Sequence, residues 1–135
     1  MLGDQIGEET GQIVVQRVLE GEHGLPPAVE TTFRATGQLL GTPVVEMATY
    51  TARLRVDGTL AGVGQGILMS PDGSHASWSG QGVGTFTGGG GVSWRGSVVY
   101  SSDSPAFAGL RGIAGVFEYE SDAAGKTTGK LWAWK

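Results

Sequence analysis

The feature that most constrains the fold is a set of glycines at every second position in the middle of the chain. Of the 25 glycines among 135 residues, 13 fall between Gly58 and Gly96. Seven of these recur at a spacing of two within the predicted strands, in phase with large aromatic residues: Gly62, Gly64, Gly66, Gly80, Gly82, Gly84 and Gly96. A period of two is typical of strands, whose alternate residues face one side. Glycine is unfavourable in ordinary strands, so this phase predicts a sheet that bends tightly or encloses space.

Turn signals such as Pro26-Pro27 and Gly88–Gly91 divide the chain into eight β-type segments. These segments cover about residues 12–19, 28–40, 44–56, 59–69, 74–87, 91–101, 110–121 and 126–134. Eight long strands with short connections predict an all-β fold, an eight-stranded antiparallel up-and-down β-barrel, because an even number lets the first and last strands pair. We expect one barrel domain over 12–135, a loose segment or short lid over 1–11, and one helical turn over 105–110.

Two turns predict which residues face the barrel interior. The sequence Ser70-Pro71-Asp72-Gly73 suits a type I turn followed by a left-handed glycine, which pairs Ser70 with Ser74. A similar turn around Asp57-Gly58 continues the same phase and keeps two arginines outside, whereas a tighter turn would bury them at a high cost. The inward face then alternates glycine with large residues: Tyr50, Trp78, Phe86, Trp94 and Tyr100, joined by Phe33, Ile113 and Phe117 from other strands.

Inward polar groups are the candidates for chemistry. Glu46 shares the phase of Tyr50 at one end of the third strand. It is either a residue of the barrel rim in water or an inward carboxyl with a raised pKa that could act as acid or base together with Tyr50. Candidate ligand-binding residues are the aromatic members of the inward face: Tyr50, Trp78, Trp94, Tyr100, Phe33 and Phe117.

Composition excludes several functional classes. The chain has no cysteine, a net charge of −4 and no basic stripe, so we expect no thiolate chemistry, no nucleic-acid partner and no anionic membrane surface. No apolar run approaches the length of a membrane span, and the expected compartment is the cytoplasm. His23 and His75 lie in or beside turns and are expected in solvent. No metal-binding spacing is present, so neither a metal nor another cofactor is predicted.

The outward phase carries a cluster of apolar residues on adjacent strands: Val45, Met47, Val63, Ile67 and Met69. A contiguous exposed apolar patch marks an association surface. It therefore predicts a homo-oligomer, either a dimer or a trimer.

Five phrases resemble those of a family of small uncharacterised bacterial and archaeal proteins. They are Pro71-Asp72-Gly73, residues 78–84, Trp94-Arg95-Gly96, Ala108-Gly109-Leu110-Arg111-Gly112 and residues 116–119. That family is in turn similar to the β-barrels grouped around plant allene oxide cyclase. The resemblance implies a barrel whose relatives include cyclases that fold a flexible apolar substrate inside a cavity. It transfers no catalytic residue, because the site of the plant enzyme depends partly on cysteine and this chain has none.

Three functions follow as alternatives. In the first, the barrel binds a small apolar molecule in a cavity of roughly 300 Å³ or more. In the second, it is a cyclase or isomerase that orients a flexible apolar substrate and uses Glu46 or a tyrosine as acid or base. The third alternative is a structural module with a filled interior and a stable oligomer.

Overall fold

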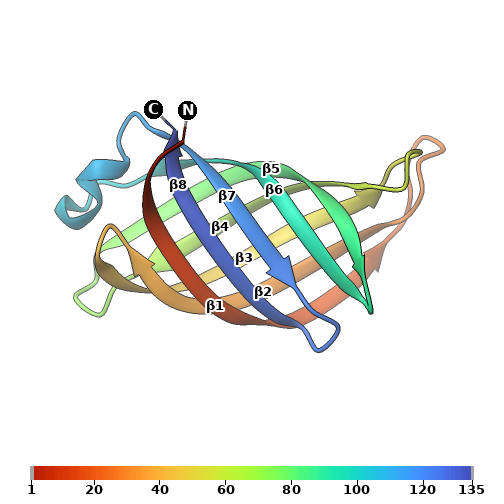
Figure 1. The fold of residues 1–135 in the computed structure, drawn as a ribbon, viewed down its shortest axis with the longest axis horizontal. Coiled ribbons are helices and arrows are strands. Elements are labelled where there is room, and N and C mark those ends of the chain that lie inside the picture. The colour runs from red at the N-terminus through yellow and green to blue at the C-terminus, as the bar shows by residue number, and fades with distance from the viewer. Residues whose placement is uncertain (1, 135) are drawn as a thin grey trace.

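The chain forms a closed barrel of eight antiparallel strands in sequence order, with the first strand paired to the last (Figure 1). The computed structural model describes residues 2–134. The strands are β1 (Leu2–Leu19), β2 (Ala28–Leu39), β3 (Thr42–Leu54), β4 (Leu60–Met69), β5 (His75–Gly88), β6 (Gly91–Ser101), β7 (Ala114–Ser121) and β8 (Lys126–Trp134). A 3₁₀ segment, η1 (Pro105–Leu110), precedes β7. The predicted eight-stranded up-and-down barrel is confirmed, as is the helical turn over 105–110.

The two turns have the predicted geometry. The backbone N–H of Arg55 donates to Thr59 at 2.7 Å, and that of Ser70 donates to Ser74 at 2.8 Å. Gly58 and Gly73 adopt φ of 86° and 87°, a left-handed conformation that favours glycine. Even-numbered residues therefore face inward from β3 to β6.

The first strand is longer than predicted. Residues 2–11 are not a loose segment or a lid but the first half of β1, and Met1 lies outside the described residues. Residues 8–12 pair with β2 on one side and β8 on the other, so this half of β1 closes the barrel. A register shift between Ile13 and Val15 moves the inward phase from odd to even positions along β1.

Two further expectations are corrected. Phe86 is 60% exposed, because it lies near the end of β5, where the register with β6 shifts after Phe86 and the wall of the barrel ends. The seventh strand begins at Ala114 rather than near residue 110, since η1 and the left-handed Gly112 occupy the preceding residues. Ile113 thus precedes β7, and it still packs against the core.

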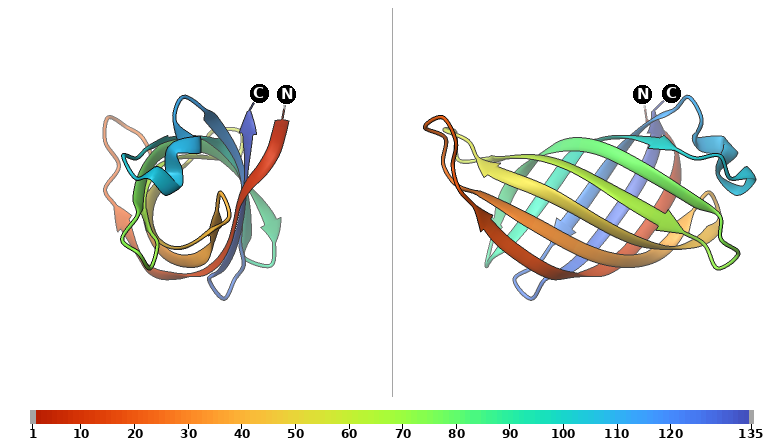
Figure 2. Two further views of the ribbon diagram at one scale, coloured as in Figure 1. Left: turned by 90° about the vertical axis from the view of Figure 1, so that its left-hand side faces the viewer. Right: turned by 180° about the vertical axis from the view of Figure 1, so that it is seen from behind.

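Two layers of buried side chains lie within the barrel. The first is covered by η1, whose Phe107 and Leu110 are 0% and 1% exposed and join a cluster that includes Leu39, Leu68 and Leu131. Figure 2 shows η1 at one end of the barrel, close to both termini. The second layer is aromatic and contains Phe33, Trp94 and Tyr119, with Tyr50 packed against it. We call this second layer the aromatic layer.

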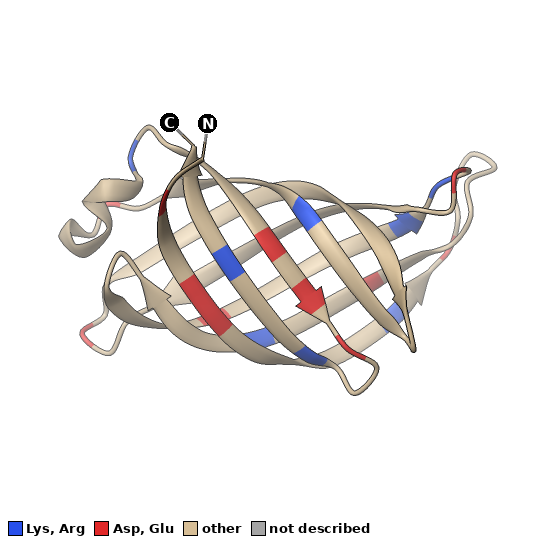
Figure 3. Ribbon diagram, in the orientation of Figure 1, with Lys and Arg blue, Asp and Glu red and all other residues tan. Residues whose placement is uncertain are grey.

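Charged residues are unevenly distributed over the outer surface. Glu8, Lys130, Glu118 and Arg95 form a row of alternating charge across β1, β8, β7 and β6 (Figure 3). On the other side, β4 contains no charged residue. The predicted apolar patch lies there on β3 and β4, and its five members are 42–60% exposed. Within residues 2–134, no helix has the length and apolar character to cross a membrane.

Candidate functional site

The barrel interior contains a partly open cavity of about 120 Å³ that is lined by residues of both the layer beneath η1 and the aromatic layer. Its lining is mostly apolar, and all six predicted ligand-binding residues belong to it: Phe33, Tyr50, Trp78, Trp94, Tyr100 and Phe117. The interior is therefore neither filled, as the structural alternative required, nor as large as the roughly 300 Å³ expected of a binding barrel.

The glycines explain the modest size of the cavity, because aromatic rings lie against them. A Cβ added to Gly62 would meet the Trp94 ring at 2.6 Å, and one added to Gly66 would meet Trp78 Nε1 at 2.4 Å. A Cβ at Gly96 would lie 2.8 Å from the ring of Phe117. The glycines thus make room for rings that cross the interior, and the cavity is the space that the rings leave.

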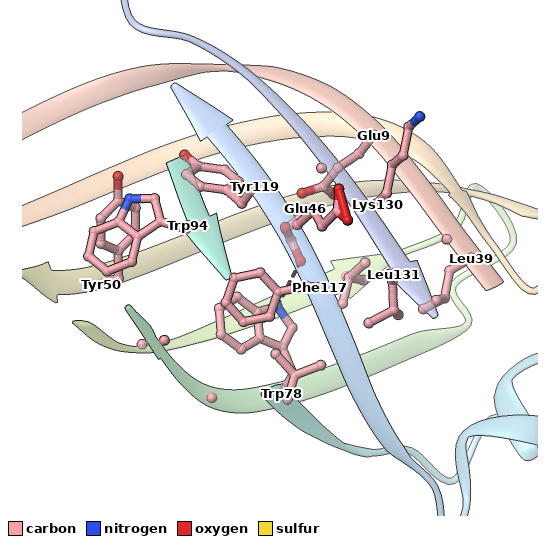
Figure 4. Close-up of a pocket in the computed structure, with 18 of the residues that line it drawn as sticks. Glu9, Leu39, Glu46, Tyr50, Trp78, Trp94, Phe117, Tyr119, Lys130 and Leu131 are labelled. Carbon is pink, nitrogen blue, oxygen red and sulfur yellow. Dashed lines mark hydrogen bonds between the residues drawn. The ribbon is translucent and has the colours of Figure 1, made fainter. Parts of the chain in front are cut away.

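Two carboxyl groups meet inside the barrel. Glu9 on β1 and Glu46 on β3 both line the cavity, and their carboxyl groups lie next to each other (Figure 4). A side-chain hydrogen bond joins them. Trp78 donates from Nε1 to Glu46 Oε2 at 2.7 Å. Glu46 is 4% exposed, which rules out the alternative of a rim residue in water. We call Glu9 and Glu46 the carboxyl pair.

The carboxyl pair holds one proton at neutral pH. Two ionised carboxylates only accept hydrogen bonds, so a bond between them needs a proton. Burial raises the pKa of Glu9, and the negative charge of Glu46 raises it further, to about 10. Burial also raises the pKa of Glu46, while the hydrogen bonds from Glu9 and Trp78 oppose this. The proton is assigned to Glu9 because the hydrogen bond between the two groups raises the pKa of Glu9 and lowers that of Glu46.

Tyr50 lies in the aromatic layer rather than beside Glu46. Its ring is 5.5 Å from that of Trp94 and 5.8 Å from that of Tyr119. Burial raises its pKa, which the neighbouring hydroxyls of Tyr119 and Thr31 partly offset. The predicted combination of Glu46 and Tyr50 is thus present in one cavity but not as a contacting pair, since the immediate partners of Glu46 are Glu9 and Trp78.

Two polar atoms of the aromatic layer lack good partners. Trp94 is 5% exposed, and its Nε1 has no hydrogen-bond partner among the described residues. The Tyr119 hydroxyl lies near Tyr50 and Thr127 but makes no hydrogen bond of normal geometry. Most buried polar atoms in proteins have a partner, so the interior is not fully satisfied by the chain itself.

Sequence reasoning missed Glu9 and Tyr119 as cavity residues. Gly7, Glu9, Gly11 and Ile13 repeat at a spacing of two, the same pattern that located the inward face elsewhere. Tyr119 follows Phe117 by two residues on β7. This spacing was the available signal, and a prediction of β1 from residue 2 would have used it.

The remaining predicted residues lie outside the cavity. His23 is exposed in the loop between β1 and β2. His75 is exposed at the start of β5, with Nε2 3.5 Å from Asp103. No group of three or more acidic, histidine or cysteine side chains that could hold a metal ion occurs within residues 2–134.

Comparison with known proteins identifies the fold and no family. The chain matches no protein-family model and no curated protein. A solved structure of a protein of unknown function from Clostridium acetobutylicum is similar, with a TM-score of 0.82 and 10% identity over 98% of this chain and 99% of that one. A conserved protein of unknown function from Rhodopseudomonas palustris has a TM-score of 0.79 and 11% identity, covering 98% and 97% of the two chains. The chain therefore shares its eight-stranded barrel with uncharacterised bacterial proteins.

Proposed function

We propose that this barrel binds a small, mostly apolar molecule in its cavity. The observation that carries the proposal is an interior lined by aromatic rings that still leaves about 120 Å³ unfilled beside the carboxyl pair. Cavities lined by apolar side chains with a few placed polar groups are typical of ligand sites. An apolar cavity of about 150 Å³ is known to accept benzene, so the expected ligand has the size of one small ring.

Toluene binding tests this proposal, with tryptophan fluorescence as the readout because Trp78 and Trp94 line the cavity. Val98 also lines the cavity and is 5% exposed, whereas its neighbour Val99 is 56% exposed on the outer face. We expect Val98→Phe to fill the cavity and weaken toluene binding by about tenfold or more. The matched variant Val99→Phe should bind toluene as the natural chain does. Equal binding by both variants, or none by the natural chain, would count against the proposal.

The carboxyl pair favours a second candidate function, an isomerase or cyclase that acts on a small apolar substrate. A neutral Glu9 beside an ionised Glu46 places a proton donor and a proton acceptor together in a desolvated site. The resemblance to the allene oxide cyclase barrels supports the same reaction class. The cavity volume limits the substrate to a shorter molecule than that resemblance implied.

Replacement of Glu46 tests the second candidate once a substrate is found. We expect Glu46→Gln to lower kcat by about 100-fold or more, the range of general acid–base catalysis. Tyr50→Phe should leave kcat within a few-fold, because Tyr50 lies in the aromatic layer. Unchanged turnover in Glu46→Gln would exclude this mechanism but would not affect the proposal that the cavity binds a small apolar molecule.

Self-association through the apolar patch is a further proposal of ours. Val45 pairs with Met69 and Met47 pairs with Ile67 across β3 and β4, so these four members are contiguous, whereas Val63 pairs with Thr51. We expect light scattering to give two or three times the chain mass of 13.9 kDa, and Ile67→Lys to weaken association by about tenfold or more. Val99→Lys, at an exposed position on the outer face of β6, is the control. A monomeric natural chain at high concentration would contradict this prediction.

A further inference from the structure

The negative charge of the carboxyl pair has no cationic partner inside the barrel. Among residues 2–134, the inward positions of the eight strands carry no lysine, arginine or histidine. Lys130 on β8 is exposed, stands opposite Glu8 and Glu118 on the outer face, and directs its amine away from the pair (Figure 4). A buried charge is costly unless it is paired. The one hydrogen bond from Trp78 and the one from Glu9 are its only compensation among these residues.

The surroundings of the carboxyl pair are aromatic. Trp78 is held against Glu46 by its Nε1, and Tyr100 is its cross-strand partner on β6. Burial and the nearby charges of Glu46 and Glu9 raise the pKa of Tyr100 well above its ordinary range, so its hydroxyl is neutral. Phe117 from β7 completes this wall of the cavity. Aromatic faces attract cations, most strongly where water is excluded.

An independent observation in the same cavity points to a missing occupant. Trp94 lines the cavity and is only 5% exposed. Its Nε1 has no hydrogen-bond partner among the described residues. The indole needs a hydrogen-bond acceptor, which an ammonium group does not supply, so Trp94 indicates an unfilled interior and the carboxylate alone indicates a cation. A purely hydrocarbon ligand would satisfy neither group.

We propose that the ligand of this cavity is a small organic amine in its protonated form, with a single ring or short apolar body and one ammonium group that donates to Glu46. The apolar body would lie against the aromatic walls, and the ammonium would supply the cation that the interior lacks. This inference rests on the proposed binding function and names its ligand class. It concerns binding alone and involves no covalent step.

Three saturated rings of matched size separate the amine from other ligands. Pyrrolidine carries a protonated nitrogen at neutral pH, tetrahydrofuran carries only an acceptor, and cyclopentane carries no polar atom. We expect pyrrolidine to bind at least about tenfold more tightly than either of the others, because hydrogen bonds to charged groups are the strong ones. Dissociation constants are measured on the full chain by tryptophan fluorescence and ligand-observed NMR.

Charge-removing variants test whether the carboxyl pair is responsible. The double variant Glu9→Gln/Glu46→Gln keeps both side-chain shapes but removes the charge, and we expect it to lose the preference for pyrrolidine over cyclopentane. Glu9→Gln alone leaves Glu46 charged, so it should weaken pyrrolidine binding less than the double variant. Glu8→Gln removes a charge from the outer face beside Glu9 and should bind pyrrolidine as the natural chain does. Circular dichroism of each variant checks that the barrel is folded.

The outcomes separate this inference from the function on which it rests. If cyclopentane binds as tightly as pyrrolidine, the assignment of an amine as the ligand is wrong, and the proposed binding of apolar molecules stands. If toluene and all three rings fail to bind the folded chain, both proposals are wrong. If pyrrolidine is preferred but the double variant keeps the preference, the amine binds elsewhere and the assignment to the carboxyl pair is overturned.

Discussion

Glu9→Gln is expected to stabilise the barrel at about pH 8 by on the order of 2–4 kcal/mol, and to leave its stability nearly unchanged at about pH 4. Glutamine resembles the protonated acid in shape and in charge. The variant therefore removes the need to hold a proton on Glu9, where burial and the charge of Glu46 have raised the pKa to about 10.

The sign follows from proton binding in the two states. An ordinary glutamate in the unfolded chain loses its proton near pH 4.5, whereas folded Glu9 keeps its proton up to about pH 10. Between these values the folded chain binds one more proton than the unfolded chain, so its stability falls as pH rises. The stabilisation that comes from the raised pKa of Glu9 is fully present below about pH 4.5 and is lost as the pH rises from there to about 10. The natural chain should thus lose stability from weakly acidic to alkaline pH, and Glu9→Gln should lose much less.

Urea unfolding at several pH values measures this effect. Glu8→Gln is the matched control, since Glu8 is the exposed neighbour of Glu9 on the outer face, where substitutions usually change stability by less than about 0.5 kcal/mol. A natural chain with equal stability at about pH 5 and pH 8, matched by Glu9→Gln at both, would show that Glu9 is not a buried acid.

The register of the barrel could be predicted because local turn chemistry determines it. Gly58 and Gly73 each follow an aspartate in a turn that suits a left-handed glycine, and such a turn sets which residues pair on either side. Once Ser70 pairs with Ser74, the strict period of two carries the inward phase along β4 and β5. The pairing of Tyr50 with Gly64 and of Trp78 with Gly66 was predictable for this reason.

The carboxyl pair could not be predicted in the same way, because β1 is positioned by barrel closure. Its first half is polar, follows no turn and pairs with β8, which lies more than 100 residues further along the chain. The register shift between Ile13 and Val15 also changes the inward phase within β1. An inward phase carried back from Gln16 would thus have placed Glu9 outside.

The size of the cavity was beyond sequence reasoning for a different reason. The period of two along the strands shows that glycines and aromatic residues share the interior, but it does not show where the rings lie. The ring of Trp94 extends from β6 across Gly84 on β5 to Gly62 on β4. That reach depends on rotamers and on close packing among Phe33, Tyr50 and Tyr119, which only the assembled barrel determines.

The inward glycines should therefore fail to tolerate even a methyl group where a ring covers them. Gly66→Ala is expected to destabilise the barrel by about 1–3 kcal/mol, although alanine is normally the better strand residue. The new Cβ would lie 2.4 Å from Trp78 Nε1 and 2.9 Å from the Cβ of Ala48, so the indole must move. That movement breaks the hydrogen bond from Trp78 to Glu46 and leaves the carboxylate with one donor fewer.

Gly7→Ala is the matched control, because Gly7 also lines the cavity but its added Cβ would lie 3.3 Å from the nearest atom, the Cβ of Leu131. We expect it to destabilise the barrel clearly less than Gly66→Ala, because its neighbours need to move by only a few tenths of an ångström. Urea unfolding measures both variants, and near-ultraviolet circular dichroism reports the displaced indole of Trp78. If Gly66→Ala proves as stable as Gly7→Ala with an unchanged spectrum, the ring does not lie over Gly66. The link between the glycine repeat and the carboxyl pair would then be lost, because it is the absence of a side chain at Gly66 that lets Trp78 reach Glu46.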